Sequence, residues 1–323
     1  MYYDEPMKKK LGGQNSGKAD DGLLILITLF IIIFVFIIPS KKLGPVQGLF
    51  SSIGGNSQWR SSNNKTGPAS DSTFASRIQV GSGNAAYESN PWSEYVTIEA
   101  RGNKQTDITG WKLKNDKDTK TYELSGNTFR YPTDAVTVPQ AALFISPTGN
   151  NIFGDIVLGD GDQVIVSSGS TGITSPYKIV NFKENKCSGY IEALPEYNFV
   201  PPLQNNCPLL RNEIGYSGLD STCKDYVSGI QGCHTPKFDG LDQNGNTCNG
   251  CVDGRVGISN ACVAFIKQHA TYTMCINNHK DDPDFSLKIW RVFLGRKFEM
   301  WDKSGETISL FDNQNKLVDY NSY

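Results

Sequence analysis

The sequence predicts an all-β sandwich that carries a small, disulfide-rich helical insertion and is preceded by one transmembrane helix. Short alternating segments, separated by turn residues about every ten positions, fill residues 78–183 and 284–323, a texture typical of a sandwich. All eight cysteines lie between Cys187 and Cys275, inside the intervening segment 184–283. We therefore expect the flanking strands to form one domain into which the cysteine-rich segment is set.

An uncharged apolar run at residues 23–39, interrupted only by Thr28, predicts the membrane helix. At about 1.5 Å per helical residue it covers about 25 Å, near the short end of what a spanning helix uses. A cleaved signal peptide is the alternative, but the run ends in Pro-Ser-Lys-Lys instead of small residues suited to cleavage. Lysines are slightly more numerous before the run than after it, which favours a cytoplasmic tail at residues 1–22.

This single-pass orientation in the cell membrane places the C-terminal domain outside the cytoplasm, at the cell surface. An even set of cysteines in a compact window agrees with it, because disulfides persist in oxidising compartments. Residues 40–77 are rich in Gly, Ser and Asn and have no regular apolar spacing. They are predicted to be a flexible linker.

Alternation assigns faces to the predicted strands. Val96 and Ile98 share one face of a strand, and Trp111 and Leu113 share the inward face of another. Further strands are expected at 142–146, 163–167 and 290–294. The Gly-Asp-Gly-Asp before the strand at 163 is interpreted as a turn and not as a calcium site.

The chain ends in a predicted hairpin formed by residues 306–311 and 316–320. An isolated hairpin is marginal in water because it cannot bury a face. We therefore expect these strands to close the sheet that begins before residue 184.

Several strands together resemble the lamin-tail domain. The resemblance rests on Glu-Tyr-Val-Thr-Ile at 94–98 and Gly-Trp-Lys-Leu at 110–113, with supporting strands at 161–166, 306–312 and 317–320. It implies an immunoglobulin-like β-sandwich and brings no catalytic residue, cofactor or metal ligand. The intervening segment is similar to a cysteine-bearing insertion of membrane-anchored bacterial members of that family, although its Cys-Asn-Gly-Cys stands outside the pattern.

Two short helices are predicted within the insertion. Asp220 is a suitable N-cap for a helix at 221–230, and Ser259 precedes a second helix at 260–269. Each helix is expected to point one cysteine at its own small core. A module with so few aliphatic residues is marginal by burial alone, so cross-links worth about 2 to 4 kcal/mol each are expected.

The sequence alone does not fix how the cysteines pair, because eight of them allow 105 arrangements. All eight are disulfide candidates: Cys187, Cys207, Cys223, Cys233, Cys248, Cys251, Cys262 and Cys275. Nearest-neighbour pairing joins Cys187 with Cys207, Cys223 with Cys233, and Cys262 with Cys275. It leaves Cys248 and Cys251 as a local pair, expected in a loop because glycines and turn residues surround it.

Besides an ordinary disulfide, two chemical functions of the Cys248/Cys251 pair stay open, namely thiol-redox catalysis and zinc binding. Thiol-redox catalysis needs the pair at the start of a helix. A zinc site would recruit Cys262 and Cys275, or His269 or His279, but a second tight pair is missing. Two further clusters are read as solvated connectors: the Asp- and Asn-rich segment 239–246, which hints at a calcium loop, and His279 with Asp281, Asp282 and Asp284.

No phosphate-binding glycine loop, nucleophile elbow or zinc-protease motif occurs in the sequence. We therefore expect a non-enzymatic binding or interaction protein whose insertion sets specificity, with a protein, glycan or nucleic-acid ligand outside the cell. The alternatives are an extracytoplasmic thiol-redox or metal-dependent enzyme centred on Cys248 and Cys251, and a surface DNA-capturing factor. The net charge of −2 gives no global attraction for DNA, although local basic residues occur at Lys288, Arg291, Arg296 and Lys297.

Overall fold

The computed structural model describes residues 71–116, 121–130, 135–170 and 174–323. The predicted cytoplasmic tail, the predicted membrane helix and nearly all of the predicted linker fall at residues 1–70, outside the described residues. Within the described ranges, no helix combines the length and the apolar character needed to cross a membrane. The described part is rich in β-strand with a few short helices, so the predicted β-class is confirmed.

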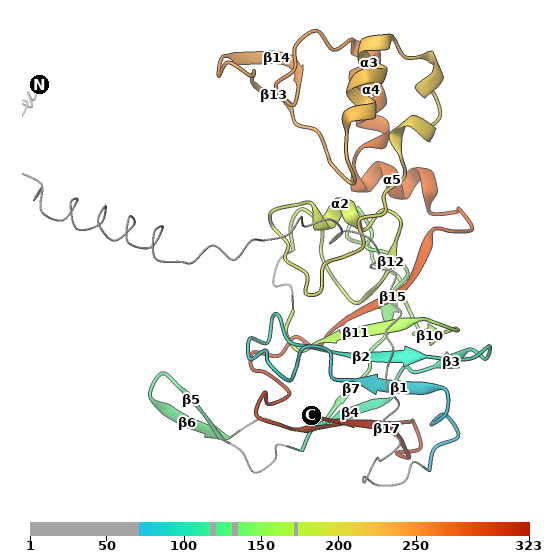
Figure 1. Ribbon diagram of the computed structural model, residues 1–323, viewed down its shortest axis with the longest axis vertical. Coiled ribbons are helices and arrows are strands. Elements are labelled where there is room, and N and C mark those ends of the chain that lie inside the picture. The colour runs from blue at the N-terminus through green and yellow to red at the C-terminus, as the bar shows by residue number, and fades with distance from the viewer. Residues whose placement is uncertain (1–70, 117–120, 131–134, 171–173) are drawn as a thin grey trace, which may run out of the picture. The chain divides into compact units, whose positions relative to one another are not determined.

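Two main sheets form a sandwich-like arrangement (Figure 1). The larger sheet contains, in spatial order, β1 (Ile78–Gly81), β2 (Tyr95–Ala100), β11 (Gln163–Ser167), β15 (Ser286–Phe293), β12 (Phe182–Asn185), β8 (Ala141–Ala142) and β9 (Phe153–Gly154). The smaller sheet contains β17 (Leu317–Ser322), β16 (Thr307–Phe311), β4 (Lys112–Lys114) and β7 (Ala135–Thr137). Two further pairs are β3 (Thr106–Asp107) with β10 (Val157–Leu158) and β5 (Thr121–Leu124) with β6 (Asn127–Arg130).

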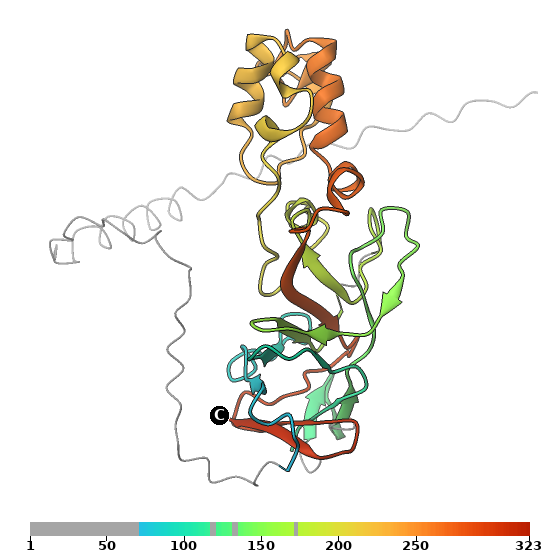
Figure 2. The same ribbon diagram turned by 90° about the vertical axis from the view of Figure 1, so that its right-hand side faces the viewer.

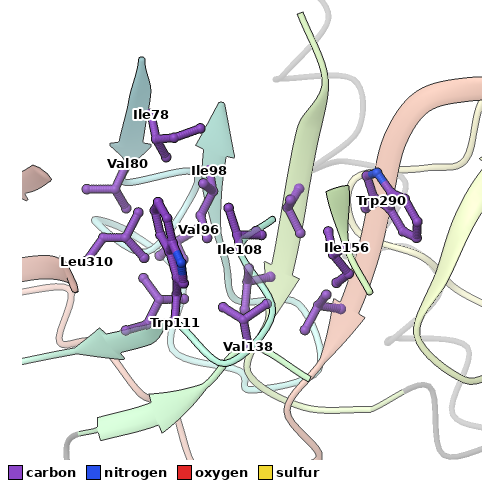
Figure 3. Packing of buried hydrophobic residues seen from close by; sticks show 14 of the residues in the cluster. Ile78, Val80, Val96, Ile98, Ile108, Trp111, Val138, Ile156, Trp290 and Leu310 are labelled. Carbon is purple, nitrogen blue, oxygen red and sulfur yellow. The ribbon is translucent and has the colours of Figure 1, made fainter. Parts of the chain in front are cut away.

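The main core draws apolar side chains from both sheets (Figure 3). Val96 and Ile98 on β2 are fully buried, as are Leu113 on β4 and Leu310 on β16, and Trp111 is 1% exposed. The shared faces predicted for Val96 with Ile98 and for Trp111 with Leu113 are therefore confirmed. The strand expected at 142–146 is shorter than predicted, because only β8 pairs there.

Strand β15 returns to the middle of the larger sheet after the insertion. It pairs parallel with β11 and antiparallel with β12. The C-terminal strands β16 and β17 form the predicted hairpin, and β16 pairs with β4. The expectation that the chain's end completes the sandwich is thus confirmed.

The glutamate of the Glu-Tyr-Val motif has a structural task. Glu94 is fully buried, and its carboxylate accepts hydrogen bonds from the Met300 amide at 2.7 Å, the Trp301 amide at 3.1 Å and the Ser168 hydroxyl. A buried carboxylate needs such donors to replace water. Glu94 thereby holds the segment that carries the buried Trp301 against the core.

The insertion contains two hydrophobic clusters. The inner core includes Tyr190, Phe199 and Tyr272 and is continuous with Phe182 of β12, whereas the outer core includes Tyr226 and Phe265. The helices are α2 (Gly189–Glu192), α3 (Ser221–Gly229), α4 (Asn260–His269) and α5 (Tyr272–His279), with 3-10 turns η1 (Leu210–Asn212) and η2 (Tyr216–Gly218) and a hairpin of β13 (Phe238–Leu241) and β14 (Thr247–Val252).

Both predicted helices are confirmed together with their caps. The Asp220 carboxylate accepts a hydrogen bond from the Cys223 amide at 2.8 Å, and the Ser259 hydroxyl accepts one from the Cys262 amide at 3.2 Å. Helix α5 was not predicted. It begins after a third cap of the same kind, in which the Thr271 hydroxyl accepts a hydrogen bond from the Met274 amide.

Candidate functional site

The disulfides correct the nearest-neighbour pairing, of which only the local pair is confirmed. The four bonds join Cys187 with Cys275, Cys207 with Cys233, Cys223 with Cys262, and Cys248 with Cys251. No free cysteine occurs in the part of the chain that the structure describes. Nearest-neighbour pairing is wrong because packing of the helices, and not distance along the chain, brings the sulfurs together.

Helices α3 and α4 lie side by side (Figure 2) and share one core. Cys223 and Cys262 occupy the same apolar stripe of their helices, and their Cα atoms are 5.5 Å apart, a usual disulfide spacing. The expectation that each helix points its cysteine at a separate core is therefore wrong. The disulfide joins the two helices through the core that they share.

The Cys248/Cys251 pair lies on strand β14 and not in the expected loop. The two residues are 7% and 1% exposed. Thiol chemistry requires an accessible sulfur, so this burial does not favour the redox alternative. Cys262 and Cys275 are each bonded elsewhere, and the described residues hold no group of three His, Cys, Asp or Glu arranged for a metal ion.

The Asp- and Asn-rich segment 239–246 comprises the end of β13 and the turn that leads into β14. Both the Asn244 and the Asn246 amides donate to the Asp242 carboxylate at 2.8 Å. The Gly250 amide donates to the Asp239 carboxylate at 2.6 Å. These carboxylates serve the hairpin's own backbone, so the predicted solvated turn is confirmed.

Two of the three histidines meet at one glutamate. Glu213 Oε2 lies 3.2 Å from His269 Nδ1, and Glu213 Oε1 lies 3.0 Å from His279 Nε2. The other nitrogen of His279 lies 2.8 Å from Asp282 Oδ2, and the hydrogen bond from His279, with one from Lys186, holds the pKa of Asp282 below its usual value.

This network tethers α5 to the segment after η1. Asp281 and Asp284 are exposed, as the connector interpretation predicts, whereas the side chain of His279 is only 17% exposed. The cluster therefore holds the insertion together at this point.

A separate concave site lies where the sandwich meets the insertion. This aromatic pocket has a volume of about 220 Å³. The sandwich contributes Trp92, Ser167, Ser170 and Phe293, and the insertion contributes Pro195, Glu196, Tyr197, Asn198, Phe199 and Val200. Four aromatic side chains from three separate segments thus line one hollow.

The Trp92 loop is fixed by backbone contacts. The Asn90 side chain accepts a hydrogen bond from the Trp92 amide at 3.1 Å, and the Gly169 amide donates to the Pro91 carbonyl at 2.6 Å. A Cβ on Gly169 would lie only 2.6 Å from that carbonyl oxygen, so only glycine permits the close approach. Trp92 is nevertheless 58% exposed, so a rigid backbone presents a large aromatic surface to solvent.

The insertion's wall of the pocket is anchored by its own rings. The Tyr197 hydroxyl donates to the Tyr177 carbonyl and accepts from the Tyr177 amide, both at 2.7 Å. Phe199 stacks on Tyr197 with ring centroids 6.0 Å apart and contacts Phe293 at 6.3 Å. The pocket's deeper rings are therefore preorganised.

A buried ion pair holds the end of this wall to the sheet. Arg291 on β15 is 2% exposed, and its Nε donates to the carboxylate of the fully buried Glu184 at 2.6 Å. Its other nitrogens donate to the carbonyls of Pro201 and Pro202 at 2.7 and 2.9 Å, directly after Val200. Because Arg291 is buried, the basic surface patch considered for DNA binding loses this member.

Two polar side chains of the pocket remain available to a ligand. The side chains of Glu196 and Asn198 are exposed, and neither makes a hydrogen bond within the described residues. Glu196 is the only charged residue among those that line the pocket. Aromatic walls with a few free polar groups are the usual composition of a ligand site.

Sequence reasoning did not find this pocket, because its residues come from segments that only the sheet topology brings together. The available signals were the Pro-Trp dipeptide at 91–92 and the aromatic cluster in Glu-Tyr-Asn-Phe at 196–199. Each is too common on its own to indicate a site.

No family model matches the chain, and no curated protein or solved structure matches it either.

Proposed function

We propose that the protein is a non-enzymatic, membrane-anchored binding protein whose lamin-tail-like, immunoglobulin-like domain faces outward and takes its ligand in the aromatic pocket. The observation that carries the proposal is the joint construction of this pocket. A preformed wall from the insertion faces an exposed tryptophan from the sandwich, and function on such scaffolds resides in grafted sites.

The four disulfides support the outward placement. They form in oxidising compartments, and they cross-link the segment that provides one wall of the pocket. The apolar run at 23–39 supports the anchor. Protease treatment of intact cells tests both, because a C-terminal tag should be lost while an N-terminal tag stays protected. The opposite pattern, or release of the whole chain into the medium, would contradict the proposed topology.

Binding is tested by calorimetry on the full-length protein in an uncharged polyoxyethylene detergent. The panel comprises choline, its neutral isostere 3,3-dimethylbutan-1-ol, methyl glucoside and acetate. We expect at least one probe to bind, and we expect Trp92→Ala to abolish that binding. Tyr87→Ala serves as the matched control, because Tyr87 is 73% exposed and does not line the pocket. Failure of all four probes at millimolar concentration, or equal binding by the Trp92 variant, refutes the proposal.

A further inference from the structure

We propose that the ligand group held by the aromatic pocket is an organic cation, specifically a quaternary ammonium or similarly alkylated amine. This inference rests on the proposed binding function and adds the chemical class of the ligand. Three features of the described residues support it, namely the charge of the pocket, the arrangement of its rings and its size.

The charge of the lining favours a cation. Glu196 is the only ionisable acid or base that lines the pocket apart from the Tyr197 phenol, and no Lys, Arg or His does so. Burial raises the pKa of Tyr197, which keeps that phenol neutral. The pocket therefore presents one negative charge and no positive one, an arrangement that repels anions and attracts cations.

The rings favour a cation with an apolar surface. Aromatic faces carry partial negative charge, so several rings around one hollow stabilise an alkylated ammonium group. Trp92, Tyr197, Phe199 and Phe293 reach the pocket from the first loop, the insertion and β15. A sugar ring would be served by one flat platform, whereas aromatic side chains from three segments line this hollow.

Within the described residues, the protein's own cations lie over other rings. Elsewhere in the structure Arg77 lies over Phe74 at 5.2 Å and Lys183 lies over Trp290 at 4.9 Å. Among the described contacts, no Lys or Arg lies over any of the four pocket rings. A cation from a ligand would therefore meet no competing Lys or Arg of the described residues at these rings.

The size of the pocket limits what enters it. At about 220 Å³ it is smaller than the several hundred Å³ typical of sites for whole drug-sized ligands. A single alkylated ammonium headgroup suits this volume. The rest of the ligand would extend into solvent past the exposed side chains of Trp92 and Glu196.

The calorimetric panel separates this inference from the proposed function. We expect choline to bind about tenfold or more tightly than 3,3-dimethylbutan-1-ol, because the two differ in charge but hardly in shape. Trp92→Ala should abolish choline binding, and Trp92→Phe should retain part of it. Glu196→Gln should weaken choline several-fold and leave the neutral isostere unchanged, a pattern that a structural defect would not produce.

The other outcomes are distinct. Equal affinity for choline and its isostere, or binding of methyl glucoside or acetate alone at Trp92, overturns the cation inference while the binding function stands. An unchanged choline affinity in Glu196→Gln removes the role assigned to that carboxylate. If no probe binds, both proposals fail together.

Discussion

Replacing Arg291 with methionine tests the joint between the sandwich and the insertion. The guanidinium makes three hydrogen bonds of 2.6 to 2.9 Å, one to the buried Glu184 and two to the carbonyls of Pro201 and Pro202. Arg291→Met preserves much of the volume but leaves the Glu184 carboxylate buried, with the Gln204 amide at 3.0 Å as its remaining donor. Removing one partner of such a buried pair lowers the free energy of unfolding by about 3 to 5 kcal/mol. This is a large share of the total for a typical protein.

The measurement is urea unfolding of the full-length, non-reduced protein in detergent, followed by tryptophan fluorescence. The double variant Glu184→Gln/Arg291→Met should recover part of the loss, because the unpaired charge is then gone. Lys183→Met is the matched control: the side chain of this neighbouring lysine is 16% exposed and sits 3.7 Å from the Asp162 carboxylate. It should cost less than Arg291→Met, because methionine can still pack on the Trp290 ring and the Asp162 carboxylate keeps the Gly159 amide as a donor at 3.0 Å.

Two results would refute this reasoning about the buried pair. One is a loss for Arg291→Met no larger than that of the Lys183 control. The other is a double variant no more stable than Arg291→Met alone, which would mean that the buried carboxylate tolerates the absence of its partner. In either case the two carbonyl contacts would not hold the pocket wall as described.

Four further outcomes are expected. Changing both Cys223 and Cys262 to serine should lower the free energy of unfolding by about 4 kcal/mol, because this disulfide closes a loop with a sequence separation of 39 residues. An equal or smaller loss than that caused by removing the Cys248–Cys251 disulfide would contradict this dependence on loop length. Asp282 has a folded-state pKa below its usual 3.8, so its contribution to stability is complete above that value and disappears as the pH falls through the lowered pKa; Asp282→Asn should therefore flatten the acid limb of a stability–pH profile, and an unaltered limb would refute this. Burial, and next the charge of a nearby glutamate, raise the pKa of Tyr190 to about 12, so its contribution is complete below pH 10.0 and is lost as the pH rises towards 12; Tyr190→Phe should reduce that alkaline loss, and a spectrophotometric titration identical to wild type would exclude the assignment. Gly169→Ala should weaken binding in the aromatic pocket by displacing its tryptophan loop while the protein stays folded, and unchanged affinity would show that the loop adapts.

Local patterns in the sequence predicted much of the fold. Alternation alone predicts the inward face of Trp111 and Leu113, because a sheet buried on one face imposes a period of two. The caps Asp220 and Ser259 located two helices, because a side chain that bonds an amide three residues on is a local requirement. Thr271 supplies the same signal for α5, but a helix of only eight residues leaves too short an apolar pattern to predict from the sequence.

Non-local features could not be predicted in the same way. The partner of Cys223 depends on how α3 and α4 pack, which no spacing along the chain encodes. The aromatic pocket depends on β15 placing Phe293 beside a loop that precedes β2. Burial of Arg291 was also unforeseen, because arginine is usually exposed unless it is paired.

The pairing of Asn185 with Ser286 shows how the insertion is joined to its host. Because these residues face each other on the antiparallel strands β12 and β15, the whole intervening segment occupies the position of a hairpin loop. Such a segment is exchangeable in principle, since its length and content do not alter the register of the strands that carry it. Two restraints act from the sandwich side. Phe182 belongs to the inner core and requires any replacement to supply an apolar cover, and the buried Arg291 and Glu184 require hydrogen-bond partners in place of the Pro201 and Pro202 carbonyls and the Gln204 amide. Evolution or a protein engineer could therefore change what this surface binds while leaving the sandwich intact.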